Sequence, residues 1–102
     1  MAAKLVDYLI SAVRYDETHS HIEFLRTHED QGDTVGSMFN LARVQVRDRL
    51  RIGQTFMTIY AGAGGNWTRG ARVEPVVIDG VTYIRTDPDA VEADNLGDLP
   101  HY

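Results

Sequence analysis

The sequence has no cysteine, and it has only three prolines and one tryptophan in 102 residues. The absence of cysteine excludes a disulfide framework, a thiolate metal site and a cysteine nucleophile, and it fits a reducing cytoplasm. No apolar run approaches the ~20 residues of a membrane-spanning helix. Asp7 also interrupts the apolar N-terminal stretch, whose alternating pattern favours a strand over a signal peptide. We therefore expect a cytoplasmic protein that does not enter a membrane.

The remaining composition is typical of one globular domain. Hydrophobic residues make up 43% and charged residues 25% of the chain, and about 100 residues suffice to bury a core without staples. The net charge of -5 is unevenly distributed, because residues 37–53 are basic whereas residues 87–102 hold five carboxylates and neither lysine nor arginine. We expect a core over residues 1–86 and an acidic tail over residues 87–102. The two charged surfaces either attract each other, serve a partner or are simply solvated.

The segment Ser37–Gly53 has the pattern of a long amphipathic helix, and we expect the strands to pack on its apolar face. Ser37 is a good N-cap residue, and Gly53 stands where a left-handed C-terminal residue belongs. At 100° per residue the apolar sector and its flanks comprise Phe39, Ala42, Val46 and Leu50, with Met38, Leu41 and Ile52. Residues 43–52 also alternate between polar and apolar with the period of a strand, which is the competing interpretation.

Five further segments are rich in β-branched and aromatic residues and predict strands. They are Lys4–Tyr15, His19–Thr27, Gln54–Ala61, Ala71–Ile78 and Val81–Thr86. A short turn joins the first two, and Asp79-Gly80 between the last two predicts a hairpin with a type I′ turn. Pro75 must lie where no ladder N–H is needed, at a sheet edge or a bulge. The predicted order is ββαβββ, an α+β domain with one helix packed on an antiparallel sheet.

The opening, the helix stop and the ending of the chain form a recognisable pattern. Its residues are Tyr8, Ile10, Ala12 and Val13 at the opening, Gly53 after the helix, Tyr83, Arg85 and Thr86 in a strand, and Asp94, Asn95, Leu96, Leu99 and Pro100 at the end. In these positions the chain resembles an uncharacterised family of short bacterial and phage proteins, a domain of unknown function. The resemblance supports the predicted fold and implies a bacterial or phage source. It implies no reaction.

The segment Gly62–Gly70 contains four glycines in nine residues, so we expect an irregular, mobile loop. Its Trp67, beside Arg69, is a candidate anchor for a binding interface, where Trp and Arg are enriched. The alternative is that Trp67 folds back to cover an end of the sheet. The glycines superficially resemble a phosphate loop, but the following Lys and Ser/Thr are missing. We therefore expect a contact surface here and no nucleotide site.

Three arginines line the expected polar side of the helix at i, i+4 spacing. Arg43, Arg47 and Arg51 span about 12 Å, a spacing that suits phosphates, an acidic partner or the acidic tail. The negative net charge favours a protein partner or the tail over duplex nucleic acid. The candidate binding residues are therefore Trp67, Arg69, Arg43, Arg47 and Arg51.

Histidines and serines offer weaker signals for chemistry. His19, His21 and His28 contain a His-x-His pair, but no third ligand is fixed, so we expect a polar hairpin edge without a metal. Ser11, Ser20 and Ser37 have no recognisable base beside them in the sequence. We expect no enzymatic activity and no cofactor.

Taken together, these features favour a small non-enzymatic binding protein that acts through protein–protein surface complementarity, such as a phage-derived inhibitor or modulator. The alternative is a nucleic-acid-associated accessory protein that uses the helix arginines and the Gly-rich loop. Exposed sheet edges also make a homodimer an option.

Overall fold

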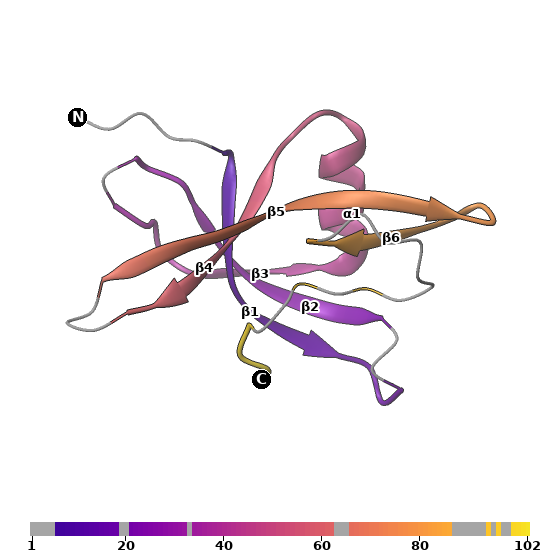
Figure 1. The fold of residues 1–102 in the computed structure, drawn as a ribbon, viewed down its shortest axis with the longest axis horizontal. Helices are drawn as coiled ribbons and strands as arrows, with labels where there is room; N and C mark the ends of the chain where they lie inside the picture. The colour runs from indigo at the N-terminus through magenta and orange to yellow at the C-terminus, as the bar shows by residue number, and fades with distance from the viewer. Residues whose placement is uncertain are drawn as a thin grey trace.

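The computed structural model describes residues 6–18, 21–32, 34–62, 66–86, 94, 96 and 99–102. The described residues form six strands and one helix, whose arrangement can be followed in Figure 1. In chain order they are β1 (Tyr8–Tyr15), β2 (Ile22–Glu29), β3 (Phe39–Ala42), α1 (Arg43–Arg51), β4 (Phe56–Ala61), β5 (Trp67–Ile78) and β6 (Val81–Arg85). The expected α+β class with one helix packed on a sheet is confirmed.

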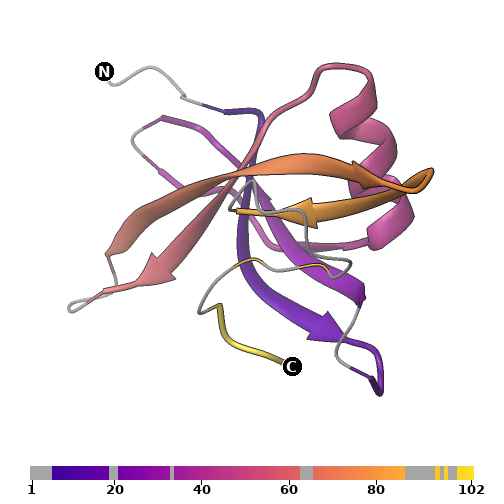
Figure 2. The same cartoon turned by 45° about the vertical axis from the view of Figure 1, so that its right-hand side comes forward.

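The sheet is mixed, with strand order β3-β2-β1-β4-β5-β6. All neighbours pair antiparallel except β1 and β4, which are parallel, so the expectation of a fully antiparallel sheet is wrong. Two strands and α1 lie between β1 and β4 in the chain, which is the long crossover that parallel pairing requires. The β1–β4 register covers only Tyr8–Ile10 against Phe56–Thr58. Beyond this register the sheet divides into two arms, one formed by β1, β2 and β3 and the other by β4, β5 and β6. Figures 1 and 2 show that the two arms diverge.

The helix starts later than predicted. Residues Phe39–Ala42 form the edge strand β3, paired with β2, so the expected helix start at Ser37 is wrong. The N-cap is Ala42, whose N–H is satisfied by Gln45 Oε1 at 2.8 Å. Over Arg43–Arg51 the helix is confirmed against the strand alternative. Its C-cap is Ile52, and Gly53 follows with φ 95°, the left-handed residue predicted at this position.

The apolar face of α1 is narrower than predicted. Val46 is its one fully buried residue and Leu50 packs partly on the core, whereas Ile52 is 77% exposed. Figure 2 shows α1 beside the β5–β6 hairpin. The helix covers one end of the sheet, and the strands supply most of the core.

The β5–β6 hairpin has the predicted turn. Asp79 and Gly80 both have positive φ, 50° and 80°, as a type I′ turn requires. Pro75 pairs with Ile84, whose N–H points away from β5 to Asp94 Oδ1. The Pro75–Ile84 pair therefore exchanges no backbone hydrogen bonds, and pairing of β5 with β4 has already ended at Val73. Pro75 thus lies where no N–H is needed, as predicted.

The core has two parts because successive residues of β1 and β4 point to opposite faces. Ile10 and Phe56 belong to the main cluster with Val46 and Leu25, whereas Leu9 belongs to a small second cluster with Val6 and Ile59. The second cluster lies on the face of the sheet that α1 does not cover. The candidate site described below is built on that face.

The described residues near the C-terminus, 94, 96 and 99–102, are called the C-terminal segment below. The expectation that this part of the chain packs through Leu96 and Leu99 is confirmed, since these residues belong to the core and are 1% and 2% exposed. Pro100 O accepts the Val13 N–H at 2.9 Å, and the Tyr102 N–H donates to Val13 O at 3.1 Å. These bonds place the last residues beside Val13, in the part of β1 that does not pair with β4. In Figure 1 they lie between the two arms of the sheet.

Asp94 joins β2 to the edge strand β6. Its carboxylate accepts the Ile22 N–H of β2 at 2.9 Å and the Ile84 N–H of β6 at 2.8 Å, and its side chain is fully buried. Arg43 of α1 binds the same carboxylate through Nε at 2.6 Å and also donates to Thr82 O of β6. Asp94 and Arg43 therefore occupy the Ile84 N–H and the Thr82 carbonyl at the free edge of β6. Backbone groups that are bound in this way are not available for pairing with a strand of another chain.

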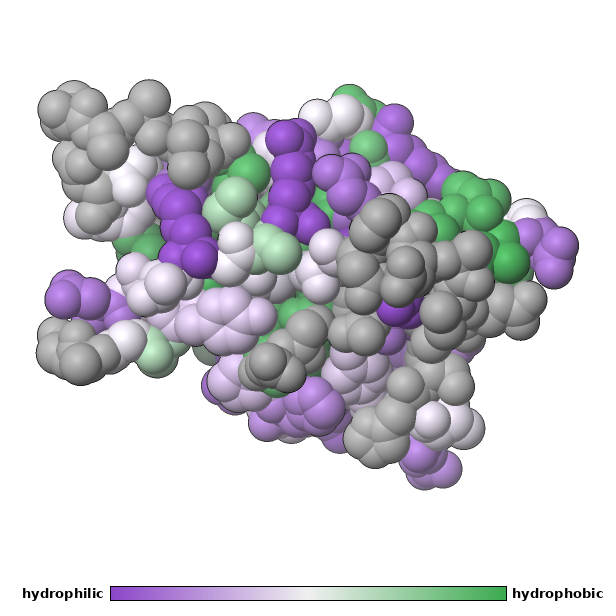
Figure 3. Space-filling view, viewed as in Figure 1, coloured by the Kyte–Doolittle hydropathy of each residue, from purple (hydrophilic) through white to green (hydrophobic). Residues whose placement is uncertain are grey.

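The surface in Figure 3 shows apolar side chains gathered at the tip of the β5–β6 hairpin, where Val77 and Val81 are 66% and 44% exposed. In the part of the chain that the structure describes, no helix is long and apolar enough to cross a membrane.

Candidate functional site

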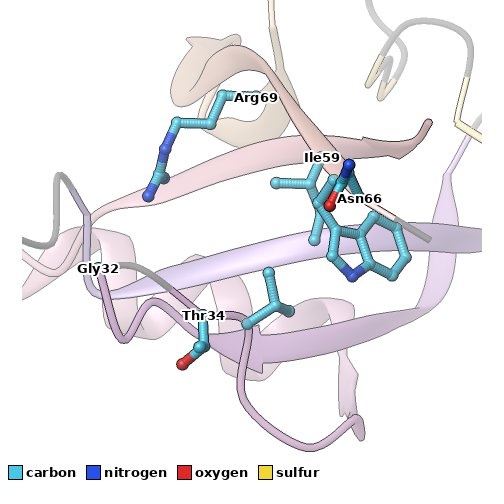
Figure 4. A pocket seen from close by; sticks show the side chains of 7 residues that line it. Gly32, Thr34, Ile59, Asn66 and Arg69 are labelled. Carbon is cyan, nitrogen blue, oxygen red and sulfur yellow. The ribbon is translucent and has the colours of Figure 1, made fainter. Parts of the chain in front are cut away.

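A pocket of about 470 Å³ lies on the face of the sheet opposite α1. It is formed between the segment after β2 and the β4–β5 hairpin, as Figure 4 shows. Its lining residues are Gly32, Thr34, Val35, Ile59, Asn66, Trp67 and Arg69. Val35 and Ile59 form an apolar floor, and Asn66, Thr34 and Arg69 bring polar groups to the walls. Its volume falls in the range of sites that bind a small molecule or a side chain.

Arg69 is held rigidly at one wall. Its two terminal nitrogens donate to the two oxygens of Asp30, each at 3.0 Å, in a bidentate pair. Asp30 is fully buried and also accepts the N–H groups of Val6 and Gly32 at 3.2 and 3.0 Å. The hydrogen bond to Asp30 raises the pKa of Arg69. The ion pair of Arg69 with Asp30 has no net charge. Arg69 therefore contributes to ligand binding mainly through directed N–H donors and less through a positive charge.

Trp67 is the first residue of β5, so the prediction that the whole of Gly62–Gly70 is irregular is wrong for Trp67–Gly70. Gly64 and Gly65 lie outside the described residues. Pairing with β4, which sets Trp67 opposite Ala61, makes this segment a strand despite its glycines. The indole is 42% exposed, and its ring centroid lies 5.8 Å from that of His28. Trp67 therefore rests on the sheet with one side open to the pocket.

A serine and a histidine form a hydrogen-bonded pair beside Trp67. Ser11 Oγ of β1 lies 2.8 Å from His28 Nε2 of β2, and His28 Nδ1 lies 2.9 Å from the carbonyl oxygen of Gly36. The sequence shows no base beside Ser11, whereas the structure places His28 there. The sequence hid the contact because it depends on the pairing of β1 with β2 across 17 residues.

The helix arginines do not form a free stripe. Arg43 is 18% exposed and bound to Asp94, so the expectation that it lies on the wet face is wrong. Arg47 Nε lies 3.2 Å from Asp48, and Arg51 donates to Thr82 Oγ1 at 3.2 Å. Trp67 and Arg69 share the pocket, whereas the helix arginines lie elsewhere on α1. The structure thus places the five predicted binding residues in two separate regions.

The histidines show no metal site among the described residues. His19 lies outside them. His21 stacks on Tyr83 with ring centroids 5.5 Å apart, and its Nδ1 lies 3.8 Å from Asp94. His28 is occupied by the contacts to Ser11 and Gly36. The two described histidines of this group therefore serve different parts of the fold.

Two buried carboxylates that organise the molecule were not predicted, Asp30 beside the pocket and Asp94 between β2 and β6. Asp94 belongs to the ending that carried the family resemblance, which was its only signal.

Comparison with known proteins agrees with that resemblance. No match was found among curated proteins or solved structures. A family model described as a protein of unknown function, DUF3892, matches residues 9–100. This match spans most of the chain, from β1 through the buried C-terminal segment. The chain therefore belongs to the DUF3892 family of proteins of unknown function.

Proposed function

We propose that this chain is a small binding protein whose contact surface is the pocket around Trp67. The observation that carries the proposal is a half-exposed tryptophan at the rim of a 470 Å³ pocket whose opposite wall holds a fixed arginine. Aromatic anchors and arginines beside a pocket are the groups that contribute most to protein–protein binding. The partner is a protein that inserts one apolar side chain against Val35 and Ile59 and offers hydrogen-bond acceptors to Asn66 and Arg69.

The proposal extends to setting and role. The chain acts in the cytoplasm of a bacterium, or on behalf of a phage, by occupying a partner's surface as an inhibitor or modulator. Support comes from the small size, the absence of cysteine and the accessible pocket. We propose that binding at this pocket requires no cofactor.

Affinity capture from a lysate of the organism that encodes the chain tests the proposal. The protein captured by the wild-type chain should be lost with Trp67→Ala, because removing a central aromatic anchor costs about 2 kcal/mol or roughly thirtyfold in affinity. Val77→Ala, at the exposed hairpin tip, is the matched control and should capture the same protein. Capture that is equal in both variants would contradict the assignment of this surface.

The structure also decides which variants are unsuitable for this test. Arg69→Ala would leave the buried carboxylate of Asp30 without its cation, so a loss of binding would report damage to the fold. Truncation of the C-terminal segment would remove Leu96 and Leu99 from the core. Trp67→Ala changes a half-exposed side chain and avoids both problems.

The alternative, a nucleic-acid-associated protein, has less support. Arg43 is committed to Asp94, and Arg47 and Arg51 lie near Asp48, at 3.2 and 4.0 Å. Paired arginines release fewer counterions from phosphates. Oligonucleotide binding that weakens steeply with salt, together with loss on Arg47→Ala, would favour this alternative over the protein partner.

A further inference from the structure

The hydroxyl of Ser11 is hydrogen-bonded to a histidine ring nitrogen, a contact that a surface used only for binding does not need. Its Oγ lies 2.8 Å from His28 Nε2, within the distance over which a general base takes a proton. We propose that Ser11 is a nucleophile, that His28 is its general base, and that the pair reacts with acyl compounds such as carboxylic esters. This inference rests on the Ser11–His28 geometry and is independent of binding at the pocket, since neither residue is among those that line it.

The hydrogen bond at the far side of the ring fixes which nitrogen is basic. Gly36 O can only accept, so His28 Nδ1 at 2.9 Å carries the hydrogen. In the neutral ring Nε2 then presents its lone pair to the Ser11 hydroxyl. The Gly36 N–H donates to Glu29 O at 3.0 Å, which holds the carbonyl in place. A base with its tautomer fixed by a second hydrogen bond is the arrangement that activates serine nucleophiles.

The backbone of β1 is distorted at the nucleophile. Pairing with β2 shifts register between Ile10 and Ala12, so Ser11 is the extra residue of a β-bulge. Bulges redirect a side chain and are frequent beside active sites. Leu9 pairs with His28, and Ser11 lies two residues after Leu9, so the alternation of the strand sets Ser11 on the same face of the sheet as His28. Ser11 is half-buried, whereas His28 is 7% exposed.

The surroundings of His28 shield the base. Its ring lies 5.8 Å from the ring of Trp67, which is itself 42% exposed and borders the pocket. A base that is largely shielded from water, next to a hydroxyl that remains partly accessible, favours proton transfer from that hydroxyl over exchange with solvent. Trp67 also supplies an apolar surface beside the reacting groups.

The reaction balances with these groups and water. Ser11 Oγ bonds to the carbonyl carbon of the ester while its proton passes to His28 Nε2. The bond to the alcohol oxygen breaks, and the alcohol leaves with that proton. Water then attacks the acyl-serine, gives its proton to Nε2 and releases the carboxylic acid, and the proton returns to Ser11 Oγ. The net change is ester plus water to acid plus alcohol, and the Gly36 carbonyl stabilises the transient imidazolium through Nδ1–H.

A fluorophosphonate probe tests the nucleophile directly. Attack by Ser11 forms an O–P bond, expels fluoride and leaves the proton to His28 and then to solvent. Peptide mapping of the folded wild-type protein should find the adduct on Ser11. Exposed Ser37 is an internal reference, and Ser11 should react at least about a hundredfold faster, the lower range of general-base assistance.

Two variants separate base catalysis from structure. His28→Gln keeps a side chain that can hydrogen-bond to Ser11 but cannot serve as the base, so labelling should fall about a hundredfold. His101→Gln changes an exposed histidine and should leave the Ser11 rate unchanged. Equal urea midpoints for the wild type and His28→Gln would show that both are folded. The proposal is overturned by equal labelling of Ser11 and Ser37, by no adduct on the folded wild type, or by an undiminished rate in folded His28→Gln.

Discussion

Single buried carboxylates set the geometry of this fold. Asp94 is fully buried and binds a backbone N–H from each of two strands and the guanidinium of Arg43. Asp30 does the same for Arg69 and two backbone N–H groups. In each case one charged side chain satisfies several polar groups that would otherwise be buried without partners. The arginines that looked available for a partner are therefore largely committed to the fold.

Neutralising Asp94 should be strongly destabilising. Asp94→Asn removes the charge opposite Arg43, and breaking a buried pair costs about 3 kcal/mol. The free energy of unfolding from urea titration measures this loss. The control Asp48→Asn changes a carboxylate that is 60% exposed and should stay within about 0.5 kcal/mol of the wild type. Equal stability of the two variants would contradict the role assigned to Asp94.

Tyr15 should make the protein less stable at alkaline pH. Burial, followed by the charge of Asp94, raises its pKa above the ordinary value of 10.0. Between the unfolded and the folded pKa the unfolded chain has lost this proton and the native chain keeps it, so stability falls as pH rises through about 10. Tyr15→Phe should flatten the dependence of the urea midpoint on pH between about 9 and 11. A slope unchanged by Tyr15→Phe would show that other groups cause it.

The elements show which parts of the fold a sequence can predict. Asp79-Gly80, Gly53 and Pro75 act through local backbone preferences, and the structure agrees with all three predictions. The start of the helix depended on a distant partner instead. Phe39–Ala42 has a helical pattern but pairs with β2, and this tertiary contact overrides the local preference.

The residues of the candidate site also divide into those that the sequence predicts and those that it does not. Trp67 and Arg69 were recognised because their residue types are common at interfaces, and the structure places both at one pocket. Ser11, His28 and Asp30 were missed as partners because their contacts join different strands. No local pattern reveals a contact that is created by strand register.

A second bulge explains a glycine within β5. Register shifts between Met57 and Ile59, and the Ala71 N–H donates to Thr58 Oγ1 at 2.9 Å. A Cβ on Gly70 would overlap Thr58 Oγ1 and Tyr60 Cε2. Only glycine lets β5 approach β4 this closely.

Gly70→Ala should therefore cost about 2 kcal/mol through steric overlap. Gly53→Ala is a useful comparison, because a Cβ there meets nothing within 4 Å but the residue has φ 95°, which costs about 1 kcal/mol. Urea unfolding of both variants should rank Gly70→Ala as the less stable. Wild-type stability of Gly70→Ala would show that the bulge does not exist in solution.

At the scale of the whole molecule, the C-terminal segment closes the fold. Leu96 and Leu99 complete the main cluster, Asp94 joins β2 to β6, and Pro100 binds β1. Attraction between the basic helix and the acidic tail was one of three alternatives, and among the described residues Arg43 and Asp94 form such a pair. The ending that carried the family resemblance therefore has a structural role.

A chain that ends at residue 93 should not fold. It loses two buried leucines, each worth about 2–4 kcal/mol, and leaves Arg43 without Asp94, against a typical total stability of about 5–15 kcal/mol. Circular dichroism should show no cooperative thermal transition. A chain that ends at Pro100 keeps these contacts and loses the Tyr102 bond to Val13, at a cost of about 1 kcal/mol. A cooperative transition in the shorter chain would contradict the closing role of the segment.

The surface assigned to a partner is on the face that this closing segment and α1 leave open. Its pocket joins the Trp67 anchor to the fixed Arg69, and the single tryptophan of the chain lies at its rim. The binding surface, the Ser11–His28 pair and the small second cluster share this face. The rest of the molecule holds them in place.

Site-specific photo-crosslinking tests the assigned surface most directly. A photoreactive phenylalanine replaces exposed Asn66 at the pocket in one variant and exposed Val77 at the hairpin tip in the other. Irradiation in cells that encode the chain should give a discrete protein adduct from position 66, absent from position 77 and lost when Trp67→Ala is added. Identical adducts from both positions, or nucleic acid alone at position 66, would contradict the account.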